Sequence, residues 1–350
     1  MIVVQLRLPT NSMNGQTHPL KQKFVIVGHG LAGAVLSQLL NEMQQPVVVL
    51  DAEMADSASR VSAGLINPFI GPKLNVPEDF SLCMSENQKF FKKREEICGQ
   101  NFLERINLHR VFGSRIQRER WDQLNDLYRI KTLTMAECSQ IGIHAPYGAG
   151  QSNAWKLESL PFIQYSKTLF QSEGNYQIAP FDPDKWKGWE VIFCDGFRGA
   201  QNQWFNYLPF SPAQGDVLTV KTEIHLNISN GTWHLRESKS ENARIGSTWK
   251  HTNIESGPTL ASMEEIFSKI DYLPKIEENQ IITHESGVRS STSDRQPFLG
   301  THPEMKNYHI FNGFGSRGCT TIALSARQLA ANLIKGTPLP EKKDIQRFSQ

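Results

Sequence analysis

Two runs of apolar residues near the start of the chain predict a strand–helix–strand unit. Phe24–Val27 and Val47–Leu50 are each four consecutive apolar residues, which is typical of buried strands. Between them, apolar residues recur with helical spacing as far as Leu40. The second strand ends at Asp51. This succession predicts the opening unit of a wound α/β domain.

A similar strand, turn and helix come near the end of the chain. Residues 308–311 predict a strand and are followed by a glycine-rich turn at 312–318. The helix predicted at 319–334 has an apolar face and ends at Gly336, with Pro338 beyond it. The N-terminus of this helix offers backbone N–H groups to a partly negative ligand group.

The segments between these two units alternate between helical and strand-like patterns. Helical spacing is found at 80–98, 115–130, 157–171 and 258–273, and Thr259 is the predicted N-cap of the last of these helices. Strands are predicted at 106–112, 190–193, 217–221, 231–236, 243–249 and 280–284. The three strands between 217 and 249 alternate with turns, which favours antiparallel hairpins.

The turn after the first strand has the glycine spacing of a dinucleotide-binding motif, Gly28-His29-Gly30-Leu31-Ala32-Gly33. Gly28 allows the tight turn, Gly30 lets a pyrophosphate approach the backbone, and Gly33 lets the helix pack close to the sheet. Asp51 lies 18 residues after Gly33, where a carboxylate can accept hydrogen bonds from ribose hydroxyls. With both strands, the helix and the acid in place, the motif predicts dinucleotide binding. The alternative is a glycine-rich turn in another α/β protein.

Composition narrows the classes of function. The chain has 37 basic and 35 acidic side chains, a net charge of +2, so nucleic acid and anionic membranes are not expected as main partners. Its 5 cysteines include no C-x-x-C pair and its 10 histidines show no ligand spacing, which favours reduced thiols and no metal. No apolar run approaches the ~20 residues that span a bilayer. Residues 1–22 are read as an extension without a signal-peptide core, so a cytoplasmic protein is expected.

Four sequence blocks together resemble the FAD-dependent D-amino-acid oxidase-like family, which includes glycine oxidase, sarcosine oxidase and the oxidase domain of the bifunctional tRNA wobble-uridine modification enzyme. The blocks are Gly28–Gly33 with Asp51, the stretch Ser57–Pro68, Gly287-Val288-Arg289 with 294–300, and Gly313–Gly318 with its helix. Their order and spacing agree over residues 23–340. The last two blocks look most like the tRNA-modifying oxidase domain, whose methyltransferase half has no counterpart here.

The resemblance implies an α/β fold, α+β overall, with a Rossmann-like FAD-binding domain and a second, antiparallel-sheet substrate domain. The FAD-binding domain would comprise residues 23–79, 150–210 and 285–350, and the substrate domain residues 80–149 and 211–284. FAD would be bound without a covalent bond, because Cys319 does not lie where sarcosine oxidases carry their covalent cysteine. The implied cofactor-binding residues are Gly28, Gly30, Leu31, Ala32, Gly33, Asp51, Ala52, Ser59, Arg60, Ser62, Ala63, Gly64, Gly196, Gly313, Gly315, Ser316, Arg317 and Gly318.

Arg289 is the main candidate for substrate binding, since members of the family place an arginine at this position to bind a carboxylate bidentately. The alternative is a structural arginine paired with an acid such as Asp294. Where the family often has a tyrosine, this chain has Trp233 and His234, which are candidate substrate contacts or core residues. Asp195 also departs from the family, because a small residue is usual there and an acid disfavours a nearby phosphate unless it points away.

The predicted function is FAD-dependent oxidation of the C–N bond of a small amine or amino acid by hydride transfer to flavin, with no separate catalytic side chain. Two alternatives remain open at this point: an oxidase acting on a modified tRNA base, and an FAD-binding protein without amine-oxidase turnover. The substrate, the electron acceptor and the oligomeric state do not follow from the sequence.

Overall fold

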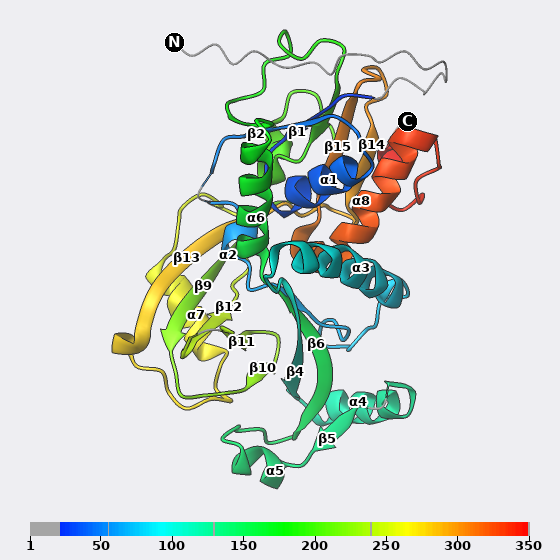
Figure 1. The fold of residues 1–350 in the computed structure, drawn as a ribbon. Helices are drawn as coiled ribbons and strands as arrows, with labels where there is room; N and C mark the ends of the chain where they lie inside the picture. Colours follow the sequence, from blue (N-terminus) through cyan, green and yellow to red (C-terminus); the bar gives the residue numbers. More distant parts are fainter. Residues whose placement is uncertain (1–21, 55, 129, 239, 349–350) are drawn as a thin grey trace.

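The computed structural model describes residues 22–348 except positions 55, 129 and 239. The predicted extension at 1–22 therefore lies, apart from its last residue, outside the described residues. Figure 1 shows two layered halves, one near the chain ends and one built around the middle of the sequence.

The first half is a six-stranded, mostly parallel sheet with the order β14-β15-β8-β1-β2-β7. Only the edge strand β14 pairs antiparallel to its neighbour. The strands are β1 (Phe24–Val27), β2 (Val47–Asp51), β7 (Tyr176–Ile178), β8 (Glu190–Phe193), β14 (Phe298–Thr301) and β15 (Tyr308–Asn312). The sequence predicts β1, β2, β8 and β15, and the structure confirms them; β7 and β14 lack an apolar run and are additions.

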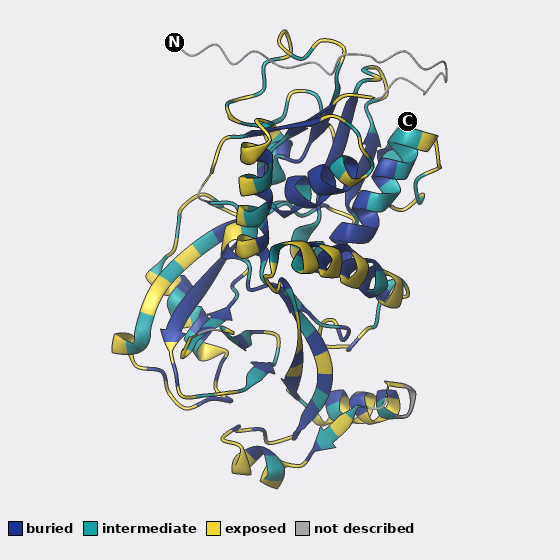
Figure 2. Cartoon of the chain, viewed as in Figure 1, coloured by how far each residue is buried: buried dark blue, intermediate teal, exposed yellow. Residues whose placement is uncertain are grey.

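Helices pack on this sheet or on one another, each through an apolar face. They are α1 (Leu31–Glu42), α3 (Phe80–Cys98), α6 (Ser159–Ser172) and α8 (Gly318–Lys335). Helix α8 packs against both α1 and α3. Gly336 ends α8 in the left-handed region at φ 67°, which confirms its predicted capping role. Figure 2 shows the buried residues concentrated in the parallel strands, α1 and α8.

The second half is a nine-stranded sheet with the order β13-β9-β12-β11-β10-β4-β6-β3, and β5 pairs with β6. All its pairs are antiparallel except β4 with β10, so the predicted antiparallel sheet is confirmed. The strands are β3 (Leu65–Ile66), β4 (Leu103–Val111), β5 (Lys131–Leu133), β6 (Ala149–Leu157), β9 (Ala213–Lys221), β10 (Asn227–Ser229), β11 (Trp233–Arg236), β12 (Asn242–Gly246) and β13 (Ile281–Arg289).

Two boundaries between the halves differ from the sequence prediction. Residues 150–157 are predicted in the FAD-binding half, but they form most of β6 and pair with all but the last residue of β4 in the second sheet. Strand β13 likewise runs across the predicted boundary at residue 285 and pairs with β9.

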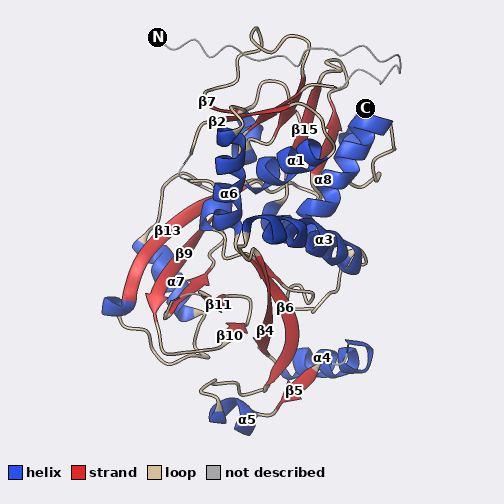
Figure 3. Cartoon of the chain, viewed as in Figure 1, coloured by secondary structure: helices blue, strands red, loops and turns tan. Residues whose placement is uncertain are grey.

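The remaining helices and turns complete the fold, which Figure 3 shows by secondary structure. The α-helices are α2 (Ala58–Val61), α4 (Arg115–Tyr128), α5 (Met135–Gln140) and α7 (Leu260–Ser268), and 3-10 turns lie at Gly196–Gln201, Glu278–Gln280, Gly315–Arg317 and Ile345–Phe348. Thr259 caps α7, since its hydroxyl accepts a hydrogen bond from the Ser262 backbone N–H. None of the described helices has the length and apolar character needed to cross a membrane.

Candidate functional site

A cavity of about 680 Å3 lies where the two sheets meet. Its walls come from the turns after β1, β2 and β8, from α2 and α6, from the start of α8, and from the facing strands β9, β11 and β13. The carboxyl ends of the parallel strands open onto it, which is the usual ligand position in a wound α/β sheet.

The glycines of the first turn have two different roles. Gly28 has φ 97°, and a Cβ there would lie 2.6 Å from the carbonyl oxygen of Cys194. Gly30 lines the cavity, together with Leu31 and Ala32. A Cβ at Gly33 would lie 2.0 Å from the carbonyl oxygen of Gly28, so this glycine lets α1 pack on β1. Gly33 is not among the residues that line the cavity, and its contact with the cofactor stays a prediction.

The first backbone N–H of α1 lies at the cavity wall and is bonded to a serine hydroxyl. The Leu31 N–H donates to the Ser59 hydroxyl over 3.0 Å, and Ser59 itself lines the cavity. Gly30 precedes the helix as its N-cap, and it has no side chain that could cap the helix. Backbone N–H groups and the positive end of the dipole at a helix N-terminus are the features that bind phosphate.

Asp51 is held at the cavity wall by two donors. The His29 backbone N–H donates to its Oδ1 over 3.3 Å, and the Tyr176 hydroxyl donates to its Oδ2 over 2.8 Å. Burial, and then the hydrogen bond to Asp51, raises the pKa of Tyr176 well above its ordinary value. Burial lowers the pKa of His29 to about 4, so this side chain is neutral at pH 7. The sequence carries no signal for Tyr176.

The chain from Ser57 onward passes along the cavity as predicted. Ala52, Ser59, Arg60, Ser62, Ala63 and Gly64 all line it. Gly64 has φ 74°, and a Cβ there would lie 1.9 Å from the carbonyl oxygen of Leu157, so the backbone runs directly against β6. Arg244 fixes the end of α2, because its guanidinium donates to the carbonyl oxygens of Val61 at 2.7 Å and Ser62 at 2.9 Å. Sequence reasoning missed Arg244.

The loop after β8 is tied to β15 through Asp195. One carboxylate oxygen accepts from the Asn312 amide and the other from the Asn202 amide, each over 2.8 Å. Burial raises the pKa of Asp195 to about 6. The Asn312 side chain also accepts from the Ser290 hydroxyl at 2.9 Å. The acid that departs from the family is therefore bonded to protein amides, and the adjacent Gly196 lines the cavity with φ 61°.

The turn before α8 divides its residues between two locations. Gly315, Ser316 and Gly318 line the cavity as predicted. Gly313 does not; a Cβ there would lie 2.6 Å from the Thr292 methyl group, so it is a packing glycine. Arg317 forms an ion pair with Asp79 at 3.4 Å and lines a different cavity, so its contact with the cofactor stays a prediction.

Arg289 reaches the cavity from the end of β13 without an acidic partner. Its guanidinium donates to the Ser247 hydroxyl and to the Thr248 carbonyl oxygen, and it lies 4.7 Å from the ring centroid of Trp249. Among the described residues, no carboxylate lies within ion-pair distance of it. Asp294 pairs with Arg347 at 2.8 Å instead, so the structural alternative of an Arg289–Asp294 pair is wrong. Burial lowers the pKa of Arg289 to about 10, which leaves it charged at pH 7.

Trp233 and His234 lie on opposite faces of β11 because side chains alternate along a strand. Trp233 lines the cavity. His234 is fully buried on the other face, where its Nδ1 lies 3.0 Å from the Leu226 carbonyl oxygen and therefore donates to it. Burial lowers the pKa of His234 to about 4. The prediction that His234 contacts substrate is wrong.

The residues that remain in the cavity fit FAD. The glycine turn with its helix N-terminus suits a pyrophosphate, Asp51 suits ribose hydroxyls, and the start of α8 supplies a second positive helix end. All three line one continuous cavity, as a long two-part cofactor requires.

Comparison with known proteins agrees with this geometry. Residues 184–332 match the family described as DAO, FAD dependent oxidoreductase. The chain is 22% identical over 386 residues to the tRNA 5-methylaminomethyl-2-thiouridine biosynthesis bifunctional protein MnmC of Hydrogenovibrio crunogenus, covering 90% of this chain and 56% of that protein. It is 27% identical over 135 residues to the glycine oxidase of Bacillus licheniformis, covering 37% of this chain and 36% of that protein. The chain thus spans about half the length of the first relative and about a third of the second.

Solved structures share the fold. Iminodiacetate oxidase from Chelativorans sp. BNC1 has a TM-score of 0.75 at 17% identity, covering 91% of this chain and 98% of its own. Glycine oxidase from Geobacillus kaustophilus also has a TM-score of 0.75 at 17% identity, covering 92% and 97%. Residues 184–332 thus match a family of FAD-dependent oxidoreductases, the solved structures share the fold of nearly the whole chain, and the cavity described above fits the FAD of that family.

Proposed function

We propose that this FAD-dependent oxidoreductase oxidises the C–N bond of a small amine that carries a carboxylate. The observation that supports this most strongly is Arg289, a half-buried arginine whose guanidinium lies in the cofactor cavity with no carboxylate partner among the described residues. An unpaired cation that is partly removed from water is costly unless a ligand neutralises it. A planar guanidinium binds a carboxylate through two parallel hydrogen bonds, which fixes the orientation of the bound molecule.

The surrounding side chains hold Arg289 in one place. Ser247 and Thr248 accept hydrogen bonds from its terminal nitrogens, and the Trp249 ring lies against its face. Trp233, across the cavity wall, adds apolar surface for the rest of the substrate. Bound FAD supplies the acceptor for the hydride of the Cα–H bond, while the nitrogen lone pair forms the new C=N bond. The protein's contribution is thus binding and orientation, which alone can lower a barrier substantially.

Cys319 also lines the cavity but is proposed to play no covalent role. Its sulfur lies 3.9 Å from the Ser62 hydroxyl and 3.8 Å from the Ser159 hydroxyl. Burial raises the pKa of this thiol, and a protonated thiol is a poor nucleophile. FAD is therefore proposed to bind without a covalent bond.

The test is anaerobic reduction of the bound flavin by a panel of amines with and without a carboxylate. Bleaching of the flavin absorbance by carboxylate-bearing amines is expected, with an Arg289→Ala variant needing at least tenfold more substrate for the same rate. Arg289→Lys keeps the charge but loses the planar fork, so an intermediate effect is expected. If no amine bleaches the flavin, amine oxidation is excluded and FAD binding without such turnover remains.

A second candidate is oxidation of a modified tRNA base. It is supported by the MnmC relative, whose alignment covers 90% of this chain, and by a second cavity beside the first that is lined with basic side chains. The test is binding of tRNA to the holoprotein at two salt concentrations, since phosphate contacts weaken steeply with salt. Absence of salt-sensitive binding would exclude this candidate.

A further inference from the structure

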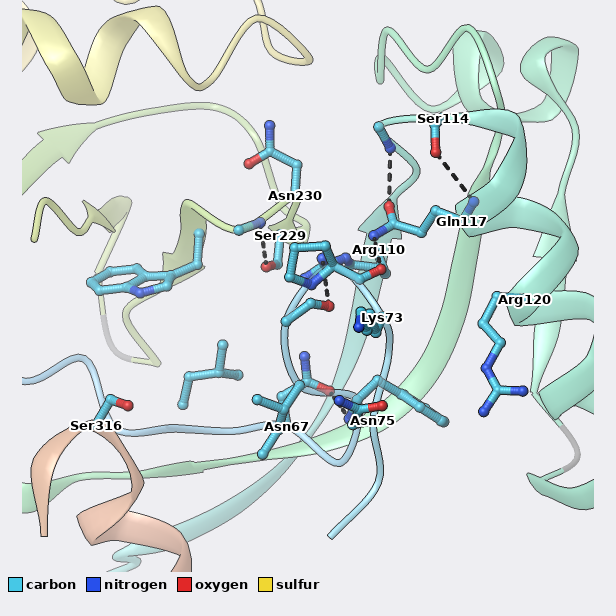
Figure 4. A pocket seen from close by; sticks show the side chains of 18 of the residues that line it. Asn67, Lys73, Asn75, Arg110, Ser114, Gln117, Arg120, Ser229, Asn230 and Ser316 are labelled. Carbon is cyan, nitrogen blue, oxygen red and sulfur yellow. Dashed lines mark hydrogen bonds between the residues drawn. The ribbon is translucent and has the colours of Figure 1, made fainter. Parts of the chain in front are cut away.

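A second cavity, of about 960 Å3, adjoins the first on the same side of the nine-stranded sheet. We call it the basic cavity. Its walls come from the loop 67–75, the end of β4, the start of α4 and the turn between β10 and β11 (Figure 4). The two cavities share four lining residues, Leu65, Gly231, Trp233 and Ser316, so they are neighbours across one wall.

The charged side chains of the basic cavity are all positive. Lys73, Arg110, Arg120 and Arg317 line it, and no aspartate or glutamate does. Arg317 is paired with Asp79, which lies outside the lining. The other three have no ion-pair partner among the described carboxylates. The remaining polar lining, which includes Asn67, Asn75, Ser229 and Asn230, consists of amides and hydroxyls that can donate hydrogen bonds (Figure 4).

Arg110 is the central feature, because it is a buried cation with unmet hydrogen-bonding capacity. Only 5% of its surface is exposed. One terminal nitrogen donates to the Gly71 carbonyl oxygen over a long 3.3 Å, and Nε has no partner. Burial lowers the pKa of Arg110 to about 10, so it stays charged at pH 7. A buried, unneutralised guanidinium destabilises the protein unless a bound anion compensates it.

The position of Arg110 is fixed by the sheet. Arg110 on β4 pairs with Ser229 on β10, and Ser229 pairs with Trp233 on β11. These three residues form one row across the strands and therefore share a face of the sheet. Two strand spacings of ~4.8 Å place the Arg110 and Trp233 backbones roughly 10 Å apart. A ligand spanning the shared wall can thus reach both cavities.

The facing loop is also anchored. The Gln117 amide donates to the Pro72 carbonyl oxygen and accepts from the Gly113 N–H, each over 3.0 Å. Phe69 and Leu74 pack into a buried cluster around Trp121. The basic cavity therefore has walls fixed by packing and hydrogen bonds, and is not a gap beneath a loose loop.

We infer that the basic cavity is an oxyanion-binding site, built around Arg110, for a phosphate or carboxylate group at the far end of the substrate. The site completes the proposed function, on which it rests for the identity of the molecule that carries the group. The amine and its own carboxylate lie at Arg289, the chain of the substrate passes Trp233, and the distal anion lies at Arg110 with Lys73 and Arg120 nearby. The substrate is accordingly an amine with two anionic ends.

The experiment measures anion binding to the FAD-loaded protein by calorimetry in chloride buffer, with pyrophosphate and succinate as separate probes. At least one probe should bind, and Arg110→Met should weaken that binding tenfold or more. Arg110→Lys keeps the charge and should retain binding within about threefold. Arg115→Gln, on the exposed face of α4 where Arg115 pairs with Glu119, is the matched control and should bind as the wild type does. Preference for pyrophosphate or for succinate tells which anion the substrate carries.

Thermal unfolding provides a second readout with opposite signs for the two roles that Arg110 can have. If it is an anion site, Arg110→Met removes an unneutralised charge and unfolds at a higher temperature than wild type without anion, while added anion raises the unfolding temperature of wild type only. If Arg110 merely braces Gly71, the variant unfolds at a lower temperature.

Two results would overturn the inference: no binding of either probe, or equal binding by wild type and Arg110→Met. Anion binding through Arg110 without flavin reduction by any amine would leave this site standing and remove the proposed function. If an amine reduces the flavin and Arg110→Met leaves the substrate affinity unaltered, the proposed function stands and the anion site is removed.

Discussion

Gly215 on β9 leaves the space that the Arg289 guanidinium occupies. A Cβ at residue 215 would lie 2.3 Å from each of the two terminal guanidinium nitrogens. These atoms end a long flexible side chain, so in a Gly215→Ala variant the guanidinium moves and the backbone stays. Gly215 is not among the glycines with positive φ, so alanine causes no backbone strain there. We therefore predict that this methyl group changes substrate affinity and not folding.

The magnitude follows from the bonds that the displaced guanidinium can no longer make. Hydrogen bonds to charged groups contribute about 1.5–3 kcal/mol. Since about 1.4 kcal/mol is a factor of ten, Gly215→Ala should raise the KM for a carboxylate-bearing amine by roughly ten- to a hundredfold. Stability should be unchanged or higher by up to ~1 kcal/mol, because alanine loses less conformational entropy than glycine in a strand.

The assay compares kcat/KM for a carboxylate amine and its analogue without the carboxylate, alongside thermal unfolding. The double variant Gly215→Ala/Arg289→Ala provides the control, since its effect should equal that of Arg289→Ala alone if both act through the same contact. A folded Gly215→Ala protein with wild-type KM would refute the assignment of Arg289 to substrate. Full additivity in the double variant would refute the mechanism of displacement.

Two further predictions concern a packing glycine and a buried histidine. Gly33→Ala puts a methyl group 2.0 Å from the Gly28 carbonyl oxygen, which is backbone and has to shift, so we expect loss of FAD and a destabilisation of about 1–3 kcal/mol, measured by flavin release and denaturant titration. His234→Asn should leave kcat/KM unchanged. In the folded wild type the pKa of His234 is lowered to about 4, so the unfolded state binds its proton first and stability falls as pH drops from about 6.5 to about 4. Over this pH range, the free energy of unfolding of the His234→Asn variant should fall by about 3 kcal/mol less than that of the wild type. A variant whose unfolding has the same pH profile as the wild type would contradict this prediction.

The sequence predicts the parallel strands well because burial on both faces requires continuous apolar runs. Strand β6 is missed for the opposite reason. Its residues include Ser152 and Lys156, which are buried although polar. Lys156 is accommodated by an ion pair with Glu158 at 2.8 Å and by the Arg236 carbonyl oxygen at 2.9 Å. Such partners come from tertiary structure, so no local pattern reveals them.

The functional site likewise contains residues that the sequence predicts and residues that it does not. Glycines are predictable because a positive φ or a close backbone approach leaves few alternatives, although the sequence does not separate packing glycines such as Gly33 from lining ones. Tyr176 and Arg244 have no motif of their own and reach the site only through the fold. For His234, the apolar neighbours on both sides hide which face of β11 points to the cavity, so the strand pattern alone does not decide.

The alternation of side chains along β9 also explains how Arg289 stays charged without a carboxylate bonded to it. Asp216 is next to Gly215 on β9, and its fully buried carboxylate points to the opposite face of the sheet, where it accepts from His284 Nε2 at 3.0 Å and the Thr259 N–H at 3.2 Å. Its charge opposes the lowering of the Arg289 pKa that burial causes. A carboxylate on the cavity face would stabilise the cation equally well, but it would occupy the hydrogen bonds that a substrate needs. Placing the acid behind the sheet favours the charged guanidinium through space and leaves its planar edge open to the cavity.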